Sequence, residues 1–155
     1  MKTQPNSSKL SVLVALVFLA TVLAASPAQA IIIICKSGMI GFTTGQTARV
    51  NVVNYGDPDQ RPVEVSVKFL NKDGNVLGEF RLPDPLQPGK AAAFDLNRDD
   101  LVGAAPGRHE IRVEVTVGDP DQKKADALRM RVKTTIEIIN NETGKTEVFI
   151  GNPEI

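Results

Sequence analysis

The stretch "HEIRVEVTV", residues 109–117, alternates apolar and polar side chains from residue 110 onward. Its apolar positions are Ile111, Val113, Val115 and Val117, and Arg112, Glu114 and Thr116 lie between them. Successive side chains of a β-strand point to opposite faces. The stretch is therefore predicted to be a strand with one face on a core and the other in water.

The same alternation continues along the chain, in segments rich in β-branched residues. These segments are residues 47–55, 63–70, 76–82, 91–96, 128–139 and 146–150. Turn sequences separate them, among them Asp73-Gly74, which is typical of a tight hairpin. Only residues 121–130 could form a short helix. Seven or eight short strands without a long helix predict an all-β, antiparallel, two-sheet sandwich, with a closed barrel as the alternative.

The first 30 residues have the layout of a secretory signal peptide. Lys2 and Lys9 precede an apolar run at residues 10–25, and small residues at positions 28 and 30 precede the expected cleavage between Ala30 and Ile31. The run is shorter than the roughly 20 residues of a membrane-spanning helix. We expect an exported chain, in the periplasm or outside the cell, with no stable membrane span after cleavage.

Residues 31–155 then form one domain, large enough for a hydrophobic core of its own. All 18 acids follow residue 30, whereas two of the 18 bases precede it, so the mature chain is slightly acidic. It has no basic field for nucleic acid or an anionic membrane. Cys35 is the only cysteine, so no disulfide can form within the chain.

Four turn and strand cues occur in a familiar order between residues 45 and 117. They are Asn54-Tyr55-Gly56, Asp73-Gly74, Pro88-Gly89, and Gly107 followed by Ile111. This order resembles the immunoglobulin-like domains of secreted bacterial proteins, particularly the cell-adhesion-related type. The resemblance implies an immunoglobulin-like (Ig-like) β-sandwich that binds or holds other proteins. After residue 117 the chain adds a further strand and a hairpin.

The word "GDPDQ" occurs twice, at residues 56–60 and 118–122, each time after an alternating segment. In an Ig-like sandwich the two following loops leave the same end. Four carboxylates would then share one rim: Asp57, Asp59, Asp119 and Asp121. The rim is a candidate binding site for a protein partner or for calcium, which needs six or more oxygen ligands. The alternative is that the word is turn chemistry alone.

The segment "IIIICKSGMIGF", residues 31–42, is apolar at consecutive positions. Such a strand is buried on both faces or lies at an edge that awaits a partner. It either folds back as the first strand or pairs with a neighbouring subunit by strand addition. The candidate interface consists of Ile31, Ile32, Ile33, Ile34 and Cys35. Cys35 itself is either buried as a small apolar residue or exposed to another chain.

Catalytic signatures are absent from the sequence. His109 is the only histidine, and no nucleophile elbow, phosphate loop or metal-spaced Cys/His pair occurs. A pair of acids acting as a hydrolase stays open as an alternative. We expect a non-catalytic protein-binding, adhesion or envelope-structure module without a cofactor.

Overall fold

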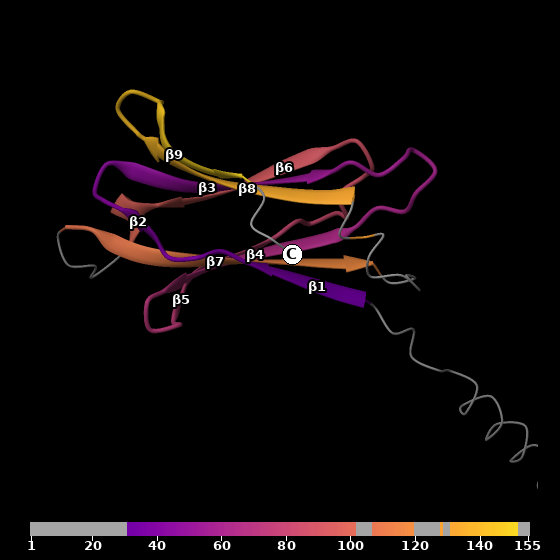
Figure 1. Cartoon of the computed structure of the whole chain (residues 1–155), viewed down its shortest axis with the longest axis horizontal. Coiled ribbons are helices and arrows are strands. Elements are labelled where there is room, and N and C mark those ends of the chain that lie inside the picture. The colour runs from indigo at the N-terminus through magenta and orange to yellow at the C-terminus, as the bar shows by residue number, and fades with distance from the viewer. Residues whose placement is uncertain (1–30, 102–106, 120–127, 129–130, 152–155) are drawn as a thin grey trace, which may run out of the picture.

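The computed structural model describes residues 31–101, 107–119, 128 and 131–151. In this part of the chain nine strands form two antiparallel sheets that lie face to face (Figure 1). The all-β, two-sheet prediction is confirmed, and the barrel alternative is wrong because the two sheets stay separate. One more strand appears than expected because residues 31–42 form two short strands.

Sheet A has the order β1-β7-β4-β5, with β2 also on β7. Its strands are β1 (Ile31–Lys36), β2 (Ile40–Phe42), β4 (Glu64–Asn71), β5 (Val76–Arg81) and β7 (His109–Asp119). β1 and β2 pair with consecutive parts of β7 and are therefore two halves of one edge. The segment at 31–42 thus folds back onto its own chain, which is the first of the two alternatives.

Sheet B has the order β6-β3-β8-β9. Its strands are β3 (Gln46–Asn54), β6 (Ala91–Asn97), β8 (Val132–Asn140) and β9 (Thr146–Gly151). A single 3-10 turn, η1 (Arg98–Asp100), follows β6, and the side chain of Asn97 accepts a hydrogen bond from Asp99 N at its start. Each sheet thus has two edges. In sheet A they are β1 with β2 on one side and β5 on the other, and in sheet B they are β9 and β6.

The alternating side chains meet between the sheets and form the core. In the central strands the inward residues are fully buried, including Val67, Phe69, Ile111 and Ile136. Phe69 also meets Phe80 of β5 edge to face, with ring centroids 5.9 Å apart. This burial of apolar area is the principal force that holds the two sheets together.

The strand arrangement agrees with the Ig type only in the middle of the chain. If β3, β4, β6 and β7 are matched to Ig strands B, C, E and F, the pairs β3–β6 and β4–β7 are as expected. In the Ig pattern the last strand then pairs with F, but here β8 pairs with β3 and the first strand pairs with β7. Relative to the Ig pattern, the first strand and β8 have thus exchanged sheets. Both strands lie outside residues 45–117, where the sequence resembles Ig-like domains.

The turns follow the expected chemistry. At Asp73-Gly74, Gly74 has φ +85°, a left-handed conformation that favours glycine, and Asn71 Oδ1 accepts hydrogen bonds from Asp73 N and Asn75 N.

The expected signal peptide at 1–30 lies outside the described residues, as does most of the possible helix at 121–130. Within the described part, no helix is long and apolar enough to cross a membrane.

Candidate binding surfaces

One end of the sandwich, here called the loop pole, carries the loop after β3, the loop after β5 and the end of β7. Asn54, the last residue of β3, is buried there. Its Nδ2 donates to Leu86 O at 3.0 Å, and its Oδ1 accepts from Gly56 N at 3.0 Å. This explains the Asn-x-Gly motif, because the asparagine side chain closes one loop and ties it to the next.

Arg131 joins the two "GDPDQ" words at this pole. Its guanidinium donates to Asp119 Oδ2 at 2.8 Å, to Gln60 Oε1 at 3.2 Å and to Arg61 O at 3.1 Å. Both side chains of the Arg131–Asp119 pair are buried. The structure therefore brings Asp119 and the first word to one end of the molecule, through a base that the sequence did not single out.

The four candidate acids have different surroundings. Asp57 and Asp59 are exposed, Asp119 is 4% exposed, and Asp121 lies outside the described residues. Among the described residues no group of three or more His, Cys, Asp and Glu side chains could hold a metal ion. The Arg131 cation also occupies one oxygen of Asp119, which disfavours a second cation there. Calcium at the rim remains an untested prediction.

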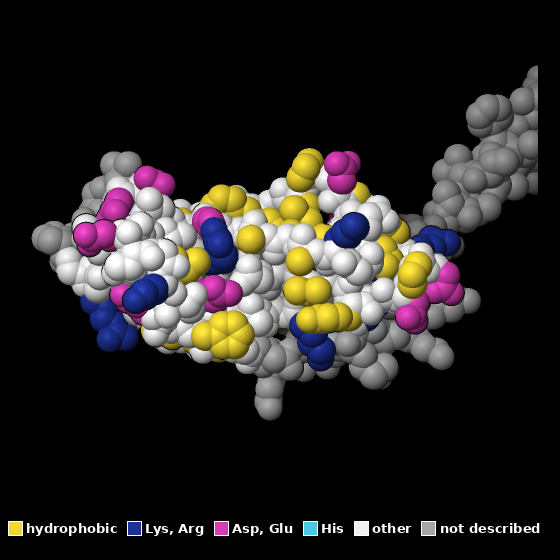
Figure 2. Space-filling model, turned by 90° about the horizontal axis from the view of Figure 1, so that it is seen from above, with side chains coloured by type: hydrophobic (Ala, Val, Ile, Leu, Met, Phe, Trp, Pro, Cys, Tyr) yellow, Lys and Arg dark blue, Asp and Glu magenta, His cyan; other side chains and the backbone are white. Residues whose placement is uncertain are grey.

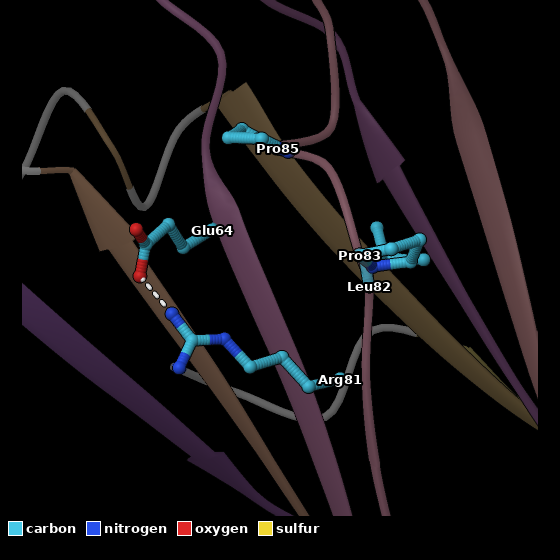
Figure 3. Close-up of a pocket in the computed structure, with 5 residues that line it drawn as sticks. All are labelled: Glu64, Arg81, Leu82, Pro83 and Pro85. Carbon is cyan, nitrogen blue, oxygen red and sulfur yellow. Dashed lines mark hydrogen bonds and ion pairs between the residues drawn. The ribbon is translucent and has the colours of Figure 1, made fainter.

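A hollow of about 350 Å³ lies beside the loop pole, lined by Glu64, Arg81, Leu82, Pro83 and Pro85 (Figure 3). Glu64 of β4 and Arg81 of β5 point toward each other across it and form an ion pair of 2.7 Å. Both side chains are well exposed, so the pair contributes little to stability. The two charged side chains that line the hollow are thus paired with each other.

The outer face of sheet B is a solvated polar surface. Figure 2 looks onto it and shows charged side chains of both signs between scattered apolar ones. Arg49 Nε and Nη2 donate to the two oxygens of Asp95 at 2.8 and 2.7 Å. This hydrogen bonding and the Asp95 charge raise the pKa of Arg49. Asn51 Nδ2 donates to Thr135 and Glu137, so these groups satisfy one another.

Two of the four sheet edges, β1–β2 of sheet A and β9 of sheet B, lie on the same side of the sandwich, here called the open side. A cleft of about 370 Å³ separates β2 from β9. It is lined by Met39, Ile40, Gly41, Thr43, Gln46, Arg108, Val148 and Ile150. In the described part of the chain, no further strand pairs with either edge.

Most large exposed apolar side chains come from the elements of the open side, but they point to different faces of the sandwich. Seven such side chains occur among the described residues, and five belong to the open side: Ile32, Ile34, Met39, Val148 and Phe149. The other two are Tyr55 at the loop pole and Val76 on β5. Ile32 and Ile34 lie on the outer face of sheet A, and Phe149 lies beside Glu137 on the outer face of sheet B. Met39 and Val148 line the cleft itself. Exposed apolar surface can mark an interaction site, and an open apolar edge can accept another strand.

The candidate interface at 31–35 is divided between the two faces of β1. Ile32 and Ile34 are exposed, whereas Cys35 is 2% exposed and lies in the core. Cys35 thus takes the buried alternative. The side chains of Ile31 and Ile33 lie outside the described set.

Arg131, Arg108 and the exposed apolar side chains of β9 were not among the residues that the sequence pointed to. A signal for β9 was present, because Val148, Phe149 and Ile150 are consecutive and must place apolar groups on both faces of a strand. Arg131 and Arg108 carry no local signal, since single bases beside strands are common on solvated faces.

Comparisons of the chain with protein-family models, with curated proteins and with solved structures gave no match. The loop pole and the open side are therefore the two surfaces from which a function can be inferred.

Proposed function

We propose that the chain is an exported, non-catalytic Ig-like module that binds another protein through its open side. Export is inferred from the signal-peptide layout of residues 1–30. A role in adhesion or envelope structure is the one that the resemblance of residues 45–117 to cell-adhesion-related domains implies. The proposed location is the periplasm or the exterior of the cell.

One observation supports the open side over the loop pole. Five of the seven large exposed apolar side chains of the described residues come from its elements, and two of them, Met39 and Val148, line the cleft. No described strand pairs with the outer backbone groups of β1, β2 or β9. At the loop pole, Arg131 and Asp119 are already paired with each other in the interior. Burial of the open side by a partner would remove apolar area from water at about 25 cal/mol per Å².

Assembly with a second copy through β1 is the second candidate. Ile32 and Ile34 alternate on the outer face of an edge strand, and their neighbour Lys36 is already paired with Glu114 at 3.3 Å. Antiparallel pairing of two β1 strands would thus bring four isoleucines together without burying an unpaired charge.

Matched aspartate substitutions test the proposed function. Ile34 and Val76 are 52% and 53% exposed and lie on opposite edges of sheet A. The bait is the mature domain, and the readouts are retention of a discrete protein from its own cell envelope and sedimentation of the purified domain. We expect Ile34→Asp to lose the retained protein and Val76→Asp to keep it.

The two candidates give different results in this experiment. If the wild-type domain sediments as a dimer and Ile34→Asp as a monomer, the partner is a second copy. Equal behaviour of Ile34→Asp and Val76→Asp in both measurements would overturn binding through the β1 edge.

A further inference from the structure

Arg108 lies in the cleft of the open side, immediately before β7. Its guanidinium lies against Gly41 of β2, because a Cβ built on Gly41 would lie 1.9 Å from Arg108 Nε and 2.5 Å from Nη2. The missing side chain at Gly41 is therefore what lets the guanidinium lie against the strand. The cation contributes to the lining of the cleft together with Met39 and Val148.

No carboxylate among the described residues forms an ion pair with Arg108. Glu110 of β7 lines a neighbouring hollow with Arg108 but makes no ion pair with it. Glu147 of β9 is engaged elsewhere, since it accepts hydrogen bonds from Gln46 Nε2 and, at 3.0 Å, from Asn140 Nδ2. The Arg108 cation in the cleft thus has no carboxylate partner among the described residues.

The rest of the cleft has the features of a strand-binding site. Among the described strands, β2 pairs only with β7, so its other side presents backbone donors and acceptors to which no described strand is bonded. Ile40 and Ile150 form apolar surface within the cleft, and Met39 and Val148 are exposed at its rim. An added strand would satisfy the backbone groups and place alternate side chains on this apolar surface.

We propose that the cleft between β2 and β9 binds an extended segment of a partner protein that carries apolar side chains and one carboxylate, which pairs with Arg108. This inference rests on the proposed protein-binding function and names the chemistry of the partner. The carboxylate belongs to an acidic side chain or to a chain terminus, since both present the same group. A guanidinium binds either one with two hydrogen bonds.

Two short peptides of alternating valine and threonine test the proposal by fluorescence anisotropy with the mature domain. One ends in a free carboxylate and the other in a carboxamide. We expect the carboxylate peptide to bind about fivefold more tightly, which corresponds to about 1 kcal/mol for a partly exposed charged hydrogen bond. A third peptide, amidated and with an internal aspartate, distinguishes the two sources of the carboxylate.

Three variants locate the effect. Arg108→Gln should remove the preference for the carboxylate while the carboxamide peptide still binds. Gly41→Ala should reduce the same preference although Arg108 is intact, because the new Cβ displaces the guanidinium. Arg81→Gln removes an exposed arginine from the far edge of the same sheet and should change neither affinity.

Equal binding of the carboxylate and carboxamide peptides would overturn the charge anchor and leave the proposed function standing. A preference for the carboxylate peptide that persists in Arg108→Gln would also overturn the charge anchor and leave the proposed function standing. Binding of neither peptide would overturn the strand-binding site in this cleft. Binding through the β1 edge fails separately, when Ile34→Asp and Val76→Asp behave alike toward the envelope partner.

Discussion

Replacement of Asp119 by alanine should strongly destabilise the fold, although the residue belongs to a turn sequence. Asp119 is 4% exposed, and its carboxylate lies 2.8 Å from the guanidinium of Arg131. At an effective dielectric constant of about 20, two charges about 4 Å apart attract by about 4 kcal/mol. Removal of one partner leaves the other charge buried, which typically costs 3–5 kcal/mol.

Thermal unfolding followed by circular dichroism measures the effect of Asp119→Ala. We expect a loss of about 3 kcal/mol, which for a domain of this size lowers Tm by about 10 °C. Arg131→Met should cost a similar amount, because it removes the cation that lies 2.8 Å from the buried Asp119 carboxylate. The double variant Asp119→Leu/Arg131→Met should recover most of the loss, since an apolar pair replaces both charges.

Asp95→Ala is the matched control for Asp119→Ala. It also removes an aspartate from an arginine at 2.7 Å, but both side chains of the Arg49–Asp95 pair are close to half exposed. Solvent screening limits such a pair to about 0–1 kcal/mol. Equal shifts of Tm in Asp119→Ala and Asp95→Ala would refute the argument that burial makes the loop-pole pair important.

Three further predictions concern the core and the turns. Ile111→Ala, at a fully buried position between the sheets, should lower the free energy of unfolding by about 3 kcal/mol in urea titrations, and a change below about 1 kcal/mol would contradict the assigned core. Gly74→Val should cost about 1 kcal/mol or more in the same assay because φ is +85°, and a neutral result would contradict the turn conformation. The Cys35 thiol should react with a maleimide only when the domain unfolds, whereas fast labelling of the native domain would show that β1 is not packed on β7.

The sequence was sufficient for the strands but not for their partners. Alternation located β4 and β7 to within a residue or two, because it reports directly which side chains avoid water. It could not tell that β8 pairs with β3 instead of β7. Both neighbours offer the same backbone groups and a similar apolar face, so the choice depends on packing across the whole domain.

The candidate sites were predictable to a smaller degree. The shared location of the two "GDPDQ" words follows from loop order, but the burial of Asp119 does not, because it depends on Arg131 reaching across from the start of β8. The exposed Ile32 and Ile34 follow from the run of isoleucines at the edge strand. The Arg108 cation depends on the absence of a side chain at Gly41, which is visible only after β2 and β7 are paired.

Site-specific photo-crosslinking in the cell envelope tests the open side most directly. A photoreactive phenylalanine analogue replaces Ile34, Phe149 or Val76, one position at a time, in the full chain expressed in its own cell. The account predicts an adduct of one discrete mass at Ile34 and at Phe149 and none at Val76. Adducts of equal yield at all three positions, or an adduct at Val76 alone, would contradict it.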